Sequence, residues 1–298
     1  MAQSWDDMRI FLGVARGESL SAAGRALRMD PATVGRRISR LEQGLGTPLF
    51  AKSPLGYALT EAGQRLIAHA ERAEQAMQAA QDAVTEGAGA LSGQIRIGAP
   101  DGCANFLLPQ VCAEISDANP DLEIQIVALP RVVNLSKREA DMAIAVSPPQ
   151  TGRLSVQKIT DYHLHLAAAQ SYLDRTGPID STQALRGRRL IGYIPEMIFD
   201  KELDYLDDFG LTRVALASNS VSVQFHWVRQ GAGLGVVHDF AIPSTTGVRR
   251  VLTDEISLTR SFYLIRHADD RRLERMNRLA IALADGLRRE VARLEALT

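Results

Sequence analysis

The stretch SLSAAGRALRMDPATVGRRISRLEQGLG, residues 19–46, contains two short helical patterns separated by the turn signal Asp30-Pro31. Ser19 or Ser21 can cap the first helix through its hydroxyl. Asp30 is typical of a helix N-cap and Pro31 of a first helical position, so a second helix is predicted to follow them. Five arginines gather around the two helices, which indicates an acidic partner: Arg25, Arg28, Arg36, Arg37 and Arg40.

The second helix is predicted to run to about residue 44 with one buried and one basic face. Val34, Ile38 and Leu41 recur at helical spacing and form the expected buried stripe. Gly35 lies in the helix interior, where glycine costs ~1 kcal/mol relative to alanine. Either it is neutral on an exposed turn, or its missing side chain lets the backbone approach a surface such as a DNA groove. The opposite face carries Thr33, Arg36, Arg37 and Arg40.

The flanking residues predict the rest of a small domain over residues 1–59. Apolar residues recur at helical spacing from Trp5 to Gly17, and glycine suits the end of a helix. Residues 48–52 and 57–59 predict two short strands that form a hairpin wing.

A long helix is predicted over residues 60–86, with Thr60 as its cap. Its apolar residues are spaced alternately by four and three, which is the heptad spacing of a coiled coil. A partner helix is therefore expected; docking on the helix's own chain is the alternative. Residues 87–93 are typical of a hinge. The expected dimerisation seam is Leu66, Ala70, Ala73, Met77, Ala80 and Val84.

Residues 94–298 alternate short apolar strands with helices, a pattern typical of α/β units with a parallel sheet. Crossover strands near residues 155–169 and 258–267 are expected to join two similar halves around a cleft. Lobe I would comprise about 94–153 and 268–298, and lobe II about 170–257. Other helices are predicted over residues 107–115, 135–139, 196–209, 221–230 and 273–294.

The charge, the hydropathy and the number of cysteines limit the class of protein to which the chain can belong. Among 298 residues the net charge is −1, yet residues 1–60 hold eight basic against five acidic side chains, so positive charge is concentrated at one end. The N-terminus lacks the pattern of a secretory signal and no apolar run is long enough to span a bilayer, so a cytoplasmic protein with no membrane contact is expected. Two cysteines cannot form a disulfide framework.

Three motifs that could indicate cofactor, metal or redox chemistry have simpler interpretations. The sequence GAGLG at residues 231–235 follows a predicted helix and leads into a strand, the reverse of a dinucleotide-binding turn. His163 and His165 share a strand face but have no third ligand nearby. Cys103, at a predicted helix start, could be redox-active, although a buried free cysteine is favoured. No motif supports catalysis, so we expect no enzyme, no metal and no cofactor.

The sequence then carries a family resemblance over nearly its full length. Residues 19–63 resemble the winged helix-turn-helix of LysR-type transcriptional regulators. IGAP (97–100), NPDLEIQI (119–126), ADMAIAV (140–146) and GAGLGVV (231–237) fall where that family has its effector-binding domain. The resemblance implies a homodimer or homotetramer that binds double-stranded DNA and whose periplasmic-binding-protein-like domain takes a small-molecule effector in its cleft.

In that arrangement the helix after Asp30 lies in the major groove. Thr33 would touch a thymine methyl or a base acceptor, and Arg36 guanine or phosphate. Arg37 and Arg40 would contact phosphates. The family usually has Ser where Gly35 stands and Arg where Lys52 stands, so the operator preference does not carry over. The expected DNA-binding residues are Arg28, Pro31, Ala32, Thr33, Gly35, Arg36, Arg37, Arg40 and Lys52.

The effector is expected at loops that follow strands and at helix starts. Where the family usually has Ser or Thr, this loop has no hydroxyl, and an uncompensated Asp101 would repel a carboxylate. The expected contacts are Pro100, Asp101, Gly102, Cys103, Ser147, Asn219, Ser220 and His238. The competing hypothesis is a two-lobed solute-binding protein or enzyme whose N-terminal segment serves only for oligomerisation, and an effector-independent regulator is intermediate between the two.

Overall fold

The computed structural model describes residues 4–53, 56–85, 91–128, 140–149, 153–206, 214–268, 270 and 273–298. The chain divides into two compact units, of which unit 1 comprises residues 1–88 and unit 2 residues 89–298. The division falls inside the predicted hinge.

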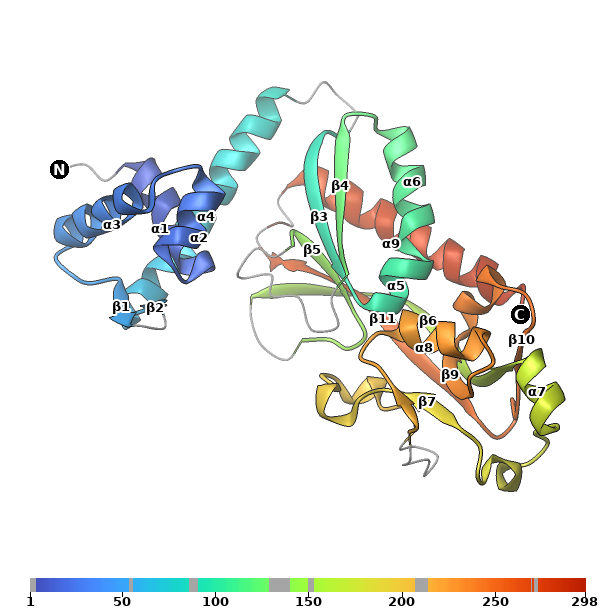
Figure 1. Ribbon diagram of the computed structural model, residues 1–298. Helices are drawn as coiled ribbons and strands as arrows, with labels where there is room; N and C mark the ends of the chain where they lie inside the picture. The colour runs from blue at the N-terminus through green and yellow to red at the C-terminus, as the bar shows by residue number, and fades with distance from the viewer. Residues whose placement is uncertain are drawn as a thin grey trace. The chain divides into compact units, whose positions relative to one another are not determined.

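The described residues of unit 1 form three helices, a two-stranded hairpin and a long helix, which Figure 1 shows in order along the chain. Ser19 accepts a hydrogen bond from the Ala22 amide at 3.1 Å and so caps α2, the helix of residues 20–27. Asp30 accepts from the amides of Ala32 and Thr33 at 2.9 and 3.2 Å, with Pro31 first in the third helix, as its sequence predicts. The elements are α1 Trp5–Gly17, α2 Leu20–Leu27, α3 Pro31–Leu45, β1 Phe50–Ser53, β2 Gly56–Leu59 and α4 Glu61–Thr85.

The hairpin is fastened to the helices by backbone contacts. The Tyr57 amide donates to the Glu18 carbonyl at 2.8 Å, and Gly56 has a φ of 131° with its Cα so close to that carbonyl that a Cβ would lie 2.5 Å from the oxygen. Glu42 of α3 accepts from the Leu49 amide at 2.8 Å. The wing is thus held against both the α1–α2 turn and the end of α3.

Unit 2 is built on one twisted sheet, nine-stranded in the described part of the chain (Figure 1). The order is β4-β3-β5-β11-β6-β9-β7-β8, and β10 also pairs with β6. Strands β6 and β11 run antiparallel along most of their length; β5 pairs with β11, and β9 and β10 pair with β6. The strands are β3 Gly93–Ala99, β4 Leu122–Ala128, β5 Met142–Ala145, β6 Leu154–Ala169, β7 Leu190–Gly192, β8 Leu216–Ala217, β9 Leu234–His238, β10 Val248–Arg250 and β11 Ser257–His267.

Helices and short 3-10 turns cover the sheet, and α9 contacts α6 and β6 through a stripe that includes Leu279, Leu283 and Leu287. None of the helices in the described ranges combines the length and the apolar character that crossing a bilayer requires. The elements are α5 Asp101–Phe106, α6 Leu108–Ala118, α7 Gln170–Thr176, α8 Val221–Arg229, α9 Glu274–Glu295, η1 Thr182–Leu185, η2 Pro195–Met197, η3 Lys201–Leu203 and η5 Asp239–Ser244.

Several predicted elements differ from the structure. The helix predicted over residues 196–209 is wrong where the chain is described: two single turns, η2 and η3, flank extended residues. Asp200 has extended backbone and its carboxylate accepts from the Glu202 amide. It therefore caps the start of η3 and interrupts the predicted helix. The α7 helix has no counterpart among the predicted elements. The helix predicted over residues 135–139 lies outside the described residues.

Candidate functional site

The first turn of α3 presents a compact exposed surface. Pro31, Ala32 and Arg36 are exposed and Thr33 is half-buried. Arg36 Nη2 donates to Thr33 Oγ1 at 2.9 Å, so the two side chains that were predicted to meet bases lie together. Arg28, in left-handed conformation at the end of α2, is also exposed.

Arg37 and Arg40, on the same helix, have a partner within the unit. Both donate to Asp7 of α1, Arg37 Nε at 2.6 Å and Arg40 Nη2 at 2.9 Å. Burial by itself would raise the pKa of the Asp7 carboxyl, but the hydrogen bonds and charges of the two arginines outweigh burial and leave that pKa lowered. The pair therefore fastens α3 to α1, and phosphate contact by these residues stays a prediction.

Gly35 lies close to a side chain of α2. A Cβ at this position would lie 3.1 Å from Leu20 Cδ1, a tight contact with the end of a flexible side chain. Neither sequence interpretation, an exposed neutral turn or an approach to DNA, foresaw this contact. In the wing, Lys52 is exposed and its Nζ lies 5.8 Å from the centre of the Tyr57 ring.

The predicted seam of α4 divides into two parts. Ala70 is buried in the core of unit 1 and Leu66 packs against the same core, so both are used by their own chain. Ala73, Met77 and Ala80 are exposed, with Met77 46% accessible. The side chain of Val84 lies outside the described residues.

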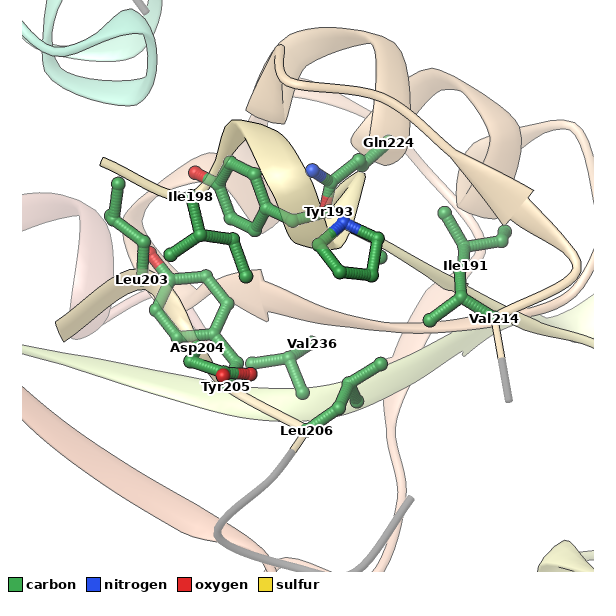
Figure 2. A pocket seen from close by; sticks show the side chains of 12 residues that line it. Ile191, Tyr193, Ile198, Leu203, Asp204, Tyr205, Leu206, Val214, Gln224 and Val236 are labelled. Carbon is green, nitrogen blue, oxygen red and sulfur yellow. The ribbon is translucent and has the colours of Figure 1, made fainter. Parts of the chain in front are cut away.

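In unit 2, a cavity of about 190 Å³ lies beside β7, β9 and the segment around η2 and η3. Figure 2 shows the Tyr193 and Tyr205 rings on one side next to Ile198, with Ile191 and Val214 on the other. Asp204 is the one charged residue among those described that line it. The remaining lining residues are Gly192, Pro195, Leu203, Leu206, Gln224 and Val236.

A second, much smaller cavity of about 20 Å³ contains most of the predicted effector contacts. It shares Tyr193, Leu203 and Tyr205 with the larger cavity, so the two cavities adjoin at these side chains. Of the predicted residues, Ser147 and Ser220 do not line it. Those that do are Pro100, Asp101, Gly102, Cys103, Asn219 and His238.

Aromatic side chains fill the space around this small cavity. Tyr162 stacks on Phe262 with ring centres 4.1 Å apart and lies 5.5 Å from the His238 ring. The hydroxyl of Tyr162 and Nδ1 of His238 are buried without a hydrogen-bond partner. Burial lowers the pKa of His238 to about 3, so the ring is neutral at physiological pH.

Three of the expected polar contacts, Asp101, Ser220 and Ser147, have hydrogen-bond partners within the chain. Asp101 is not uncompensated: its Oδ2 accepts from the Ser222 amide at 2.8 Å and from Ser220 Oγ at 3.0 Å, both at the start of α8. Ser147 donates its hydroxyl to Asp200. Asn219 also lines the small cavity, and no hydrogen bond of its side chain is described.

The remaining motifs have structural partners or are shielded. Cys103 and Cys112 are buried, and burial raises the pKa of both thiols, that of Cys112 to about 11. Such thiols are protonated at neutral pH and react slowly, which argues against a redox role. His165 Nδ1 lies 2.9 Å from both carboxylate oxygens of Asp239, and His163 Nδ1 lies 2.8 Å from Glu295. Among the described residues, no three potential ligands gather to hold a metal.

Sequence reasoning missed the aromatic residues of the site. Tyr193 directly follows β7, so the rule that ligands lie beyond the carboxyl ends of strands could have found it. Tyr162 lies within the long crossover strand β6 and Phe262 within β11. No local signal distinguishes these two from ordinary core residues.

Comparison with known proteins connects both units to one family. Residues 5–64 match the profile described as "Bacterial regulatory helix-turn-helix protein, lysR family", and residues 88–288 match "LysR substrate binding domain". The transcriptional activator TtdR of Escherichia coli K12 is 29% identical over 241 residues, covering 78% of each chain. The regulator CrgA of Neisseria meningitidis MC58 is 25% identical over 65% of this chain, and the match spans 64% of CrgA, just under two thirds.

Solved structures share the fold. Full-length OxyR from Pseudomonas aeruginosa superposes with a TM-score of 0.70 at 18% identity, covering 96% of this chain and 98% of OxyR. LysG from Corynebacterium glutamicum, solved with arginine as bound effector, gives 0.62 at 19% identity over 96% and 98%. Since one family profile alone matches more than half of the residues and the other matches the N-terminal unit, the chain belongs to the LysR family of bacterial helix-turn-helix regulators.

Proposed function

We propose that this chain is a sequence-specific, DNA-binding transcriptional regulator that acts in the cytoplasm as a homodimer or homotetramer and responds to a small molecule bound in unit 2. One observation supports the DNA contact above all: the start of α3 is exposed and rigidly held. Asp30 caps the helix and the pair of Arg37 and Arg40 with Asp7 fixes its rotation on α1.

Arg36 and Thr33 are then the base-reading residues, and Arg28 and Lys52 contact the backbone or the minor groove on either side. A helix presented in this way enters the major groove with its N-terminal residues at the base edges. The hydrogen bond between Arg36 and Thr33 orients the guanidinium before DNA arrives, which lowers the entropy lost on binding.

The effector part of the proposal is supported by the 190 Å³ cavity. Its lining is largely apolar with a few polar groups, which is typical of a small-molecule site. A ligand changes the state of the regulator only by binding one arrangement more tightly than another.

The experiment is a titration of the full-length protein with labelled duplex from the region upstream of its gene, at several salt concentrations. Arg36→Ala should cost roughly 1–3 kcal/mol of binding free energy for the specific duplex and little for a scrambled one. Arg289→Ala, an exposed arginine of α9 in unit 2, is the matched control and should bind as the wild type does.

Specific binding should persist at salt concentrations that abolish binding to the scrambled duplex. Equal affinity of the wild type for both duplexes at every salt concentration would contradict the proposal. That result would favour the alternative, a two-lobed solute-binding protein or enzyme whose first unit only oligomerises. Wild-type affinity of Arg36→Ala would instead remove Arg36 from the base-reading role.

A further inference from the structure

The start of α8 is occupied by a carboxylate that belongs to the chain. The Ser222 amide and the Ser220 hydroxyl both donate to Oδ2 of Asp101, a residue on α5 that is about 120 positions away in the sequence. Ser220 also caps α8 by accepting from the Val223 amide at 3.2 Å. Asn105 donates to the second oxygen, Oδ1, at 3.1 Å. Both carboxylate oxygens of Asp101 therefore accept hydrogen bonds from donors of the chain.

A helix start attracts anions because its first amides have no partner within the helix and carry the positive end of the dipole. In this chain the Ser222 amide already donates to Asp101 and the Val223 amide to Ser220. An anionic ligand at this position would have to displace Asp101 or lie beside its negative charge, and both are unfavourable.

The surrounding cavities offer an anion no compensation. None of the described residues that line either cavity is Lys or Arg, and Asp101 and Asp204 are the carboxylates among them. His238 is neutral because burial lowers its pKa. The nearby Arg260 is committed to Glu202, with Nε 2.9 Å from the carboxylate.

The small cavity has unused neutral hydrogen-bonding groups. Tyr162 is fully buried and His238 is 4% exposed, yet the Tyr162 hydroxyl and His238 Nδ1 have no partner, and both side chains line the small cavity. A buried polar atom without a partner costs free energy that a ligand hydroxyl or carbonyl can recover. At about 20 Å³ this cavity has room for such a polar group alone, so a ligand ring would lie in the adjoining cavity, which at about 190 Å³ exceeds the ~150 Å³ that suffices for benzene.

We infer that Asp101 is a built-in anion that closes the start of α8, and that the site consequently selects an uncharged ligand of about one ring bearing a hydroxyl or carbonyl, and rejects carboxylates. This inference rests on the proposed effector site and assigns its ligand class. Ligand discrimination then comes from the protein's own carboxylate, which holds the position a ligand carboxylate would otherwise take.

The first test uses the full-length wild type and three probes that share a ring and differ in charge: benzyl alcohol, benzoate and benzylamine. Each is titrated at constant ionic strength while the unfolding temperature Tm is followed. A ligand at ~10 times its Kd raises the Tm of a domain of this size by about 3–6 °C. Benzyl alcohol should raise Tm with an apparent Kd at least tenfold lower than that of benzoate or benzylamine.

The second test asks whether removing the Asp101 carboxylate lets the site bind benzoate. Asp101→Ala frees the donors of α8, so benzoate should now raise Tm at a concentration at least tenfold lower than in the wild type. Asp101→Asn keeps the size of the side chain and removes its charge, so it gives the same direction of change if the alanine variant does not fold. Asn105→Ala retains the contacts of Asp101 with α8 and should keep the wild-type preference.

Three results would each overturn the inference. The first is that benzoate or benzylamine stabilises the wild type as well as benzyl alcohol does. The second is that none of the probes stabilises the wild type, and the third is that neither Asp101 variant gains affinity for benzoate. DNA affinity without any probe is measured separately, so a failure here is distinguishable from a failure of the proposed regulator function.

Discussion

At the scale of single residues, the basic face of α3 has two separate roles. Arg36 is exposed and its described side-chain hydrogen bond goes to Thr33, whereas Arg37 is held by Asp7, whose side chain is 9% accessible. The charge of Arg37 therefore compensates a carboxylate that packing has largely removed from water. Sequence spacing puts the two arginines side by side, but only their partners distinguish them.

Arg37→Ala should lower the free energy of unfolding of unit 1 by about 1–3 kcal/mol, because it removes a charged hydrogen bond from a buried carboxylate. Arg36→Ala, measured in the same urea titration of the full chain, should stay within about 0.5 kcal/mol of the wild type. Equal effects of the two substitutions would contradict the assignment.

The pH dependence gives an independent check on this prediction. The pKa of Asp7 is lowered from 3.8, so its carboxylate stabilises the fold above that value and the contribution is lost as pH falls through the lower, folded-state pKa. The difference between wild type and Arg37→Ala should therefore be constant near neutral pH and shrink below about pH 4.

At the scale of secondary structure, the elements with local signals were predictable. The starts of α2 and α3 are predictable from Ser19, Asp30 and Pro31, because a helix cap is a hydrogen bond between residues two or three positions apart. The predicted helix over residues 196–209 failed because helical spacing of apolar residues is also compatible with two short turns, and tertiary contacts decided between them. The extended Asp200, whose carboxylate accepts from Ser147, is such a contact.

In the candidate site, too, positions could be predicted from local sequence whereas tertiary partners could not. Six of the eight residues expected from positions after strands and at helix starts line the small cavity, because strand ends meet at one edge of a sheet, and their contact with an effector stays a prediction. Partners could not be predicted in this way, because Asp101 and Ser222 are separated by about 120 residues. A carboxylate that looks unpartnered in the sequence can therefore have hydrogen-bond donors in the fold, as Asp101 does.

Helix α4 carries the prediction at this scale. Leu66 and Ala70 are used by the core of their own unit, so only Ala73, Met77 and Ala80 of the described seam remain to meet a second helix. Met77→Lys should weaken the homodimer by roughly 1.5–3 kcal/mol, the contribution of a buried methionine, as measured by sedimentation equilibrium.

The control for this prediction is Ala76→Lys, which adds the same charge at an exposed position one residue off the seam. A lysine there can keep its ammonium group in water while its aliphatic stem lies along the helix, so the dimer should stay intact. A Met77→Lys protein with wild-type dimer affinity would exclude this seam.

At the scale of the whole molecule, charge is uneven along the chain and the two cores are separate. Residues 1–60 carry eight basic and five acidic side chains, while the whole chain has a net charge of −1, so the remainder is negative. Residues 61–88, which complete unit 1, hold two basic and five acidic side chains, so the excess of positive charge lies in the segment that contains α3 and not in unit 1 as a whole. This distribution favours DNA contact through residues 1–60.

The two hydrophobic cores share no residue: one contains Ile38 and the other Leu283, each at most 1% exposed. Each unit should therefore unfold in its own transition, which calorimetry of the full-length protein can resolve. Ile38→Ala should lower one transition and Leu283→Ala the other, each through a loss of about 2–5 kcal/mol from removed contacts and an unfilled cavity. If either substitution lowered both transitions equally, the units would be energetically coupled, because independent cores transmit no cavity cost to each other.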